Sequence, residues 1–187
     1  AFEDFKNLNH LNLSGNKLIY EDLMRKPVKS DDGQQINNLN FKTFKTLNIS
    51  YNMLTNKFLD TLNKFTNLEK VSLAGTNIVL NENQLRNFNK CRELNLSSNK
   101  LGKECFAKLK SLKWVAGLEV LRLDNNKITD FSRNDLDGFT GLKKLSLCKN
   151  TIHQLNRSSF SNMNYLEILH LKNNQIESIG PNSFSSL

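Results

Sequence analysis

Histidine and cysteine are the residues of this chain that could hold a metal ion or act as nucleophiles, and both are scarce. His10 and His170 lie near opposite ends of the chain, so they cannot form one metal site. The cysteine spacings do not match a zinc motif, and neither nucleophile-elbow, zinc-protease nor phosphate-loop patterns occur. The sequence therefore predicts no enzyme, no metal and no cofactor. The residues concerned are His10, His153, His170, Cys91, Cys105 and Cys148.

Asparagine, by contrast, recurs at a fixed place in a repeated motif. Residues 142–152, LKKLSLCKNTI, carry three leucines and then Asn150, three residues after the last of them. Seven copies of this motif occur in 187 residues, and their commonest spacing is 24 residues. Repetition at such a period is typical of a solenoid, in which each repeat stacks on its neighbours.

The polar–apolar alternation within each motif predicts a short strand with one buried face. In the copy at 144–148, Leu145 and Leu147 would point inward, whereas Ser146 and Cys148 would point outward. One such strand cannot bury its leucines alone. Stacked copies would form a parallel sheet over a continuous core.

The recurrent asparagine is expected to be structural. Its amide can donate to and accept from the backbone where each strand turns away, so stacked copies would form a buried ladder. Thr76 takes this place in the third copy. The predicted ladder comprises Asn16, Asn52, Asn99, Asn126, Asn150 and Asn174.

Apolar residues between the motifs are expected to fill the core from the outer side. Segment 102–117 has apolar residues at every third position, which predicts a helical turn, with Trp114 either packed on the flank or exposed. Because these outer segments are bulkier than strands about 4.8 Å apart, the stack should curve around the sheet. An aromatic spine is predicted at Phe5, Phe41, Phe65, Phe88 and Phe139.

The repeated motif resembles the leucine-rich repeat family over nearly the whole chain. Its 24-residue period with a convex phenylalanine is similar to the extracellular subclass, which includes Toll-like receptors, guidance proteins and matrix proteoglycans. The resemblance implies an α/β solenoid, the leucine-rich repeat horseshoe, with a parallel β-sheet on the concave face and irregular or short helical convex segments. A single array of about seven repeats over residues 1–187 is expected. Since neither end has a polar cap, we interpret it as an internal fragment.

One spacing is longer than the others, and the overall charge is basic. The first spacing of 36 residues predicts an insertion within 20–40, which is either a functional loop or a tolerated surface bulge. The net charge is +8 and the pI about 9.4. This balance can favour a polyanion such as nucleic acid or an acidic glycan, or an acidic protein, but lysines spread over solvated faces are the more common explanation.

Four Asn-X-Ser sequons predict N-linked glycosylation if the chain is secreted. Three lie in strand motifs, where such strings arise easily, so the fourth, on the convex side, is the clearest. The sequon asparagines are Asn12, Asn48, Asn95 and Asn156.

Outward strand positions of the last three repeats lack sequons and mix cations, a carboxylate and apolar groups. This mixture favours ligand recognition there, with the flank or the insertion at 20–40 as alternatives. The predicted ligand-binding residues are Arg122, Asp124, Lys144, Ser146, His170 and Lys172.

The resemblance implies a ligand-recognition ectodomain of a Toll-like receptor, extracellular or luminal within a type I membrane protein. A protein or glycan ligand and receptor dimerisation would follow, with nucleic acid as a further candidate ligand. The alternative is a secreted or matrix protein for adhesion or axon guidance. An intracellular scaffold would require the sequons to be accidental.

Overall fold

The computed structural model describes residues 7–18, 42–81 and 84–187. The predicted insertion at 20–40 and two members of the predicted aromatic spine, Phe5 and Phe41, lie outside these ranges.

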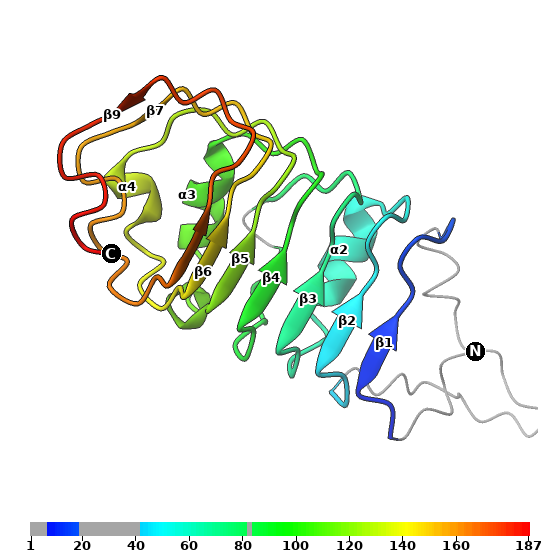
Figure 1. Ribbon diagram of the computed structural model, residues 1–187. Helices are drawn as coiled ribbons and strands as arrows, with labels where there is room; N and C mark the ends of the chain where they lie inside the picture. Colours follow the sequence, from blue (N-terminus) through cyan, green and yellow to red (C-terminus); the bar gives the residue numbers. More distant parts are fainter. Residues whose placement is uncertain (1–6, 19–41, 82–83) are drawn as a thin grey trace, which may run out of the picture.

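One strand from each repeat joins a seven-stranded parallel sheet, as the alternating motif predicts (Figure 1). Consecutive repeats are neighbours throughout, and the central residue of each strand, for example Leu121 beside Leu145, pairs with the next in register. The strands are β1 (His10–Asn12), β2 (Thr46–Asn48), β3 (Lys70–Ser72), β4 (Glu93–Asn95), β5 (Val120–Arg122), β6 (Lys144–Ser146) and β8 (Ile168–His170).

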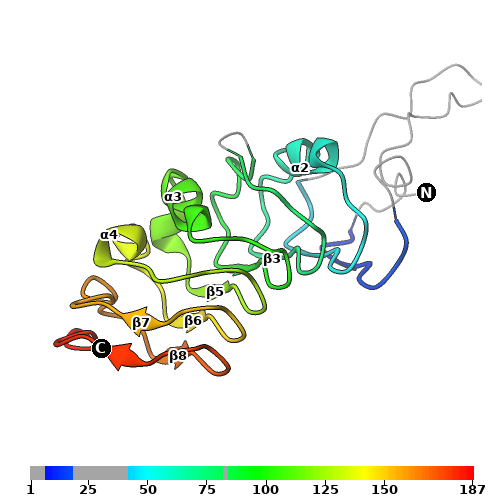
Figure 2. The same ribbon diagram turned by 90° about the horizontal axis from the view of Figure 1, so that it is seen from above.

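Short helices cover the opposite side of the array, and Figure 2 shows the sheet on the inner side of the arc and the helices on the outer side. They are α2 (Asn56–Leu62), α3 (Glu104–Lys110), the 3-10 turn η1 (Val115–Gly117) and α4 (Arg133–Leu136). A capping box of Ser132 and Asp135 begins α4. The last two repeats instead pair β7 (Gln154–Leu155) with β9 (Ser178–Ile179) in a second parallel sheet. These two-residue strands are too short to leave a periodic signal.

The core lies between the sheet and the outer segments. The described residues of the predicted spine, Phe65, Phe88 and Phe139, are all buried. Trp114 is only 6% exposed, so the alternative of an exposed indole is wrong. A further aromatic series among the outer-side apolar residues joins Phe106, Phe131, Phe160 and Phe184 through ring centroids 5.7–5.8 Å apart.

Hydrogen bonds of the repeated asparagines link each repeat to the previous one. The Asn99 side-chain N–H groups donate to the carbonyls of Leu96 in its own repeat (3.0 Å) and Leu73 in the repeat before (2.8 Å). Its Oδ1 accepts from the N–H groups of Thr76 and Ile78. Asn52, Asn126, Asn150 and Asn174 repeat this arrangement. Asn16 is exposed, and its hydrogen bonds with the described residues lie within its own turn.

Candidate ligand-binding face

The parallel register places one residue of each repeat in the same row across the concave face. The first outward row runs through His10, Thr46, Lys70, Glu93, Val120, Lys144 and Ile168. The second row contains Asn12, Asn48, Ser72, Asn95, Arg122, Ser146 and His170. Neighbouring members of a row stand on strands about 4.8 Å apart, so a ligand could touch several repeats at once.

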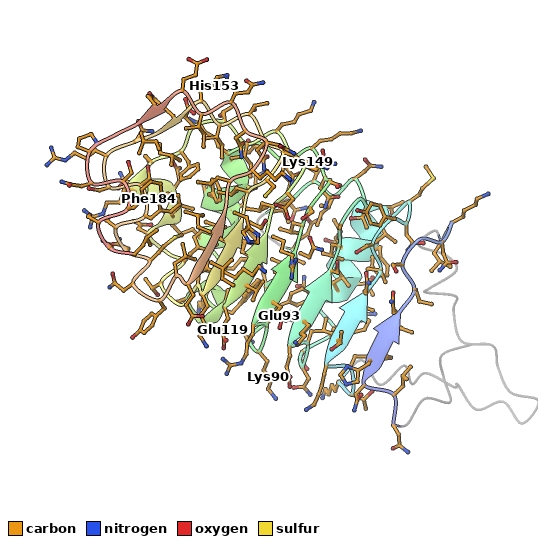
Figure 3. All side chains as sticks on the ribbon, viewed as in Figure 1. Lys90, Glu93, Glu119, Lys149, His153 and Phe184 are labelled. Carbon is orange, nitrogen blue, oxygen red and sulfur yellow. The ribbon has the colours of Figure 1, made fainter. Side chains whose placement is uncertain are left out.

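Charged side chains in the first part of the face are largely paired. Lys70 and Glu93 form an ion pair of 2.6 Å across β3 and β4, and this hydrogen bond raises the pKa of Lys70. Lys45 lies 3.5 Å from Glu69 at the same edge. Such contacts leave little charge available to a ligand. Figure 3 shows Glu93 near the edge of the sheet where the strands begin.

Glu119 continues this pairing at the boundary between the two parts of the face. Its carboxylate accepts hydrogen bonds from Lys143 (2.9 Å) and Arg92 (2.5 Å), and these two cations lower the pKa of Glu119. The three side chains belong to three consecutive repeats. The cluster therefore connects repeats at the surface rather than presenting a free carboxylate.

The last three repeats present basic side chains without such partners. Arg122, His170 and Lys172 are exposed and Lys144 is half-buried. Within the described ranges, none of the four forms an ion pair. The structure thus gathers them on one face, although they span 51 positions of the chain.

Asp124 and Ser146, also predicted to contact ligand, bond to each other. The Ser146 hydroxyl donates to Asp124 Oδ1 at 2.5 Å, and the Cys148 N–H donates to the same oxygen at 2.8 Å. Ser146 is consequently only 3% exposed, which corrects the expectation that it points into solvent. The backbone N–H of Asp124 in turn donates to Ser97 Oγ at 3.2 Å, so Asp124 ties three repeats together through its carboxylate and its backbone.

Two shallow grooves meet at Arg122. One, of about 310 Å³, runs over β2–β5 and includes the Lys70–Glu93 pair. The other, of about 560 Å³, lies at the carboxyl ends of the strands and includes Asp124, Asn125 and Lys149. Asn125 and Lys149 were not among the predicted contacts. Both directly precede a ladder asparagine, at φ 53° and 55°, and this position is the signal that could have identified them.

The four sequons differ in accessibility. Asn12 is exposed, and its Oδ1 accepts the Ser14 N–H at 3.0 Å. Asn48 and Asn95 make the same turn but are half-buried. The side-chain N–H of Asn156 donates to the Phe131 carbonyl of the preceding repeat at 2.9 Å. This contact holds the half-buried Asn156 against the preceding repeat.

Cysteine and histidine do not assemble into a reactive centre in the described part of the chain. Burial raises the pKa of Cys91 and of Cys105 to about 12, so both are thiols at neutral pH. Cys148 is half-buried and also free. No cluster of three or more His, Cys, Asp or Glu side chains suited to a metal occurs within the described ranges. Nor does any described helix have the length and hydropathy to cross a membrane.

Comparison with known proteins agrees with this architecture. A leucine rich repeat family model matches residues 140–187. No curated protein sequence matches the chain. Among solved structures, internalin C2 of Listeria monocytogenes is 24% identical with a TM-score of 0.62, covering 78% of this chain and 58% of its own.

Two further solved structures have the same fold. A TLR13–ssRNA13 complex is 24% identical with a TM-score of 0.64, covering 78% of this chain and 20% of that one. A TDR receptor is 20% identical with a TM-score of 0.54, and the match covers 72% of this chain and 23% of that one. The chain thus spans 58% or less of each of these three structures, and these likenesses concern the fold. With the seven-copy motif and the seven-stranded parallel sheet, the matches show a leucine-rich repeat fold, and the family model identifies residues 140–187 as leucine-rich repeats.

Proposed function

We propose that the chain recognises an anionic ligand non-covalently through the last three repeats of its concave face. The observation that carries the proposal is the difference in ion pairing along this face. Lys70 is neutralised by Glu93, whereas Arg122 and Lys144 have no ion-pair partner among the described side chains. Unpaired cations on adjacent strands create a positive potential that would attract and orient an anionic partner.

The grooves beside Arg122 supply the shape that such recognition needs. The groove at the carboxyl ends of the strands offers Lys149 together with the Asn125 amide and the Ser98 hydroxyl. Lys149 adds charge, while the amide and hydroxyl can donate or accept hydrogen bonds. The ligand would therefore be an extended acidic segment of a protein, an acidic glycan or a nucleic acid strand lying across several repeats.

The parent protein proposed for this recognition surface is a Toll-like receptor, with the chain in its extracellular or luminal part. The 24-residue period and the likeness to a TLR13–ssRNA13 complex support this assignment. A secreted adhesion or guidance protein is the alternative, because internalin C2 is matched at the same 24% identity. A membrane span and a signalling domain in the longer parent sequence would favour the receptor.

The test reverses Arg122 and Lys144 together to glutamate. Binding of a single-stranded RNA oligonucleotide and of a polyglutamate peptide is measured by fluorescence anisotropy at low and high salt. We expect the affinity for at least one probe to fall about tenfold or more, with the larger effect at low salt. The matched control reverses Lys90 and Lys127, both exposed and away from the two grooves, and should retain binding. Equal losses in both variants, or no loss in the first, would reject the proposed site.

A further inference from the structure

A second groove lies on the outer side of the array, where a short repeat meets a long one. Its volume is about 610 Å³, and its lining residues are Arg86, Ala107, Lys108, Ser111, Leu112 and Lys113. The third repeat, with a spacing of 23 residues, has only turns over residues 84–90. The fourth, with a spacing of 27 residues, carries α3 and η1. Because the outer segment of the third repeat is smaller than that of the fourth, the groove lies beside α3, on the helical side of the arc in Figure 2.

Buried contacts join the third and fourth repeats beside this groove. The indole N–H of Trp114 donates to the Leu85 carbonyl at 2.7 Å, and its ring lies 6.0 Å from that of Phe88. Arg86 and Lys113 are the direct chain neighbours of Leu85 and Trp114. The buried contact therefore brings these two cations, 27 positions apart in the sequence, to the same groove.

Lys108 forms the third cationic side chain of the groove. Its Nζ donates to the Leu80 carbonyl at 2.7 Å, which ties α3 to the third repeat. An ammonium group has three N–H donors, so two remain for a ligand. Ala107 and Ser111, one helical turn apart and both exposed, flank Lys108 with short side chains that leave the groove open.

Among the described residues, none that lines this groove carries a carboxylate. Two acidic side chains near it are engaged elsewhere: Glu104 of α3 accepts the Gly102 N–H at 3.1 Å, and Asp137, which directly follows α4, pairs with Lys110 at 3.0 Å. Lys113 is exposed and has no ion pair within the described part of the chain. The described lining of the groove thus carries basic side chains and no acidic one.

We propose that this outer groove binds the sulfate groups of a sulfated polysaccharide. Lys113 and the two remaining N–H donors of Lys108 can meet successive anionic groups along a flexible sugar chain, and Arg86 adds positive charge to the groove. Single-stranded nucleic acid is disfavoured because its bases bind on exposed aromatic rings. No aromatic residue of the described ranges lines the groove, and the ring of Trp114 is buried. The site is separate from the concave face, so its existence does not depend on the function proposed above.

The probe is a heparin-derived hexasaccharide, with its desulfated form and a single-stranded RNA oligonucleotide as comparison ligands. Titration calorimetry on the wild-type chain is compared with Lys113→Glu and with Ala107→Glu, which places a carboxylate on the groove floor. Lys127→Glu is the control, because Lys127 is exposed and does not line the groove. Circular dichroism checks that each variant is folded.

We expect each groove variant to weaken hexasaccharide binding about tenfold or more, with the loss greatest at low salt. Lys127→Glu and the Arg122→Glu/Lys144→Glu double variant should bind it nearly as well as wild type. Equal losses in Lys127→Glu and Lys113→Glu would overturn the proposal, because net charge would then explain binding. Undiminished binding of the desulfated sugar, or tighter binding of RNA at this groove, would overturn it as well.

Discussion

Replacing Asn126 by alanine should destabilise the fold far more than its small change in volume suggests. The side chain is 8% exposed, and its Oδ1 accepts the N–H groups of Asn99 (3.0 Å) and Leu101 (2.9 Å). Its own N–H groups donate to the carbonyls of Leu96 (3.1 Å) and Leu123 (3.0 Å). Alanine would leave two buried donors and two buried acceptors without these bonds.

Each unsatisfied buried group costs about 1–3 kcal/mol, and local relaxation recovers part of the total. We therefore expect the free energy of unfolding to fall by about 2–4 kcal/mol, a large share of the total for a domain of this size. Urea unfolding followed by circular dichroism measures the change, with an unaltered m-value showing that the unfolded state is unaffected.

The control for this measurement is Asn89→Ala, since Asn89 is exposed and forms no hydrogen bond with the described residues. Asn173, another exposed asparagine, is unsuitable because it has φ 60°, where alanine adds backbone strain. If Asn126→Ala and Asn89→Ala have equally small effects, the repeated asparagines do not stabilise the stack as inferred here.

Three further outcomes follow from groups near the surface. Native labelling with an alkylating agent at pH 8 should modify Cys148 well before Cys91 or Cys105, because the buried pair have pKa values of about 12; mass spectrometry showing equal modification would contradict this. The lowered pKa of Glu119 stabilises the fold above its unfolded pKa of about 4.5, and this contribution is lost as the pH falls through the folded value. Glu119→Gln should therefore make acid unfolding less steep below that pH, and an unchanged profile would contradict the pairing. In a secretory host, peptide mapping should find glycan most often at Asn12, whose side chain is the most exposed of the four sequons; an unmodified Asn12 beside a modified, half-buried sequon would refute that order.

Elements that follow the repeat could be predicted residue by residue. The alternation at Leu145 and Leu147 located β6 and its buried face, because only period-two residues can share one side of a strand. Apolar residues at every third position of 102–117 predicted α3 and η1. The pairing of β7 with β9 was missed, because two residues per strand carry no measurable periodicity.

For the candidate site, the sequence predicted which residues face outward but not which of them are covered by a neighbouring side chain. Its cations could be assigned to the outward face from register alone, since each strand repeats the same in–out pattern. Ser146 has the same outward position, yet Asp124 from the preceding repeat covers it. That contact depends on side-chain geometry between strands, which the pattern of one strand does not contain.

The sequence by itself determined the solenoid, the order of its strands and the places of the asparagine hydrogen bonds. These features repeat, and any one copy buries its apolar face only by stacking on the next. Only the tertiary structure decided which cations are neutralised and which are not, because Lys70 and Arg122 look alike until the neighbouring repeat supplies Glu93 to one of them. It likewise decided that Arg86 and Lys113 share a groove, since the Trp114–Leu85 hydrogen bond depends on two repeats of unequal length lying side by side.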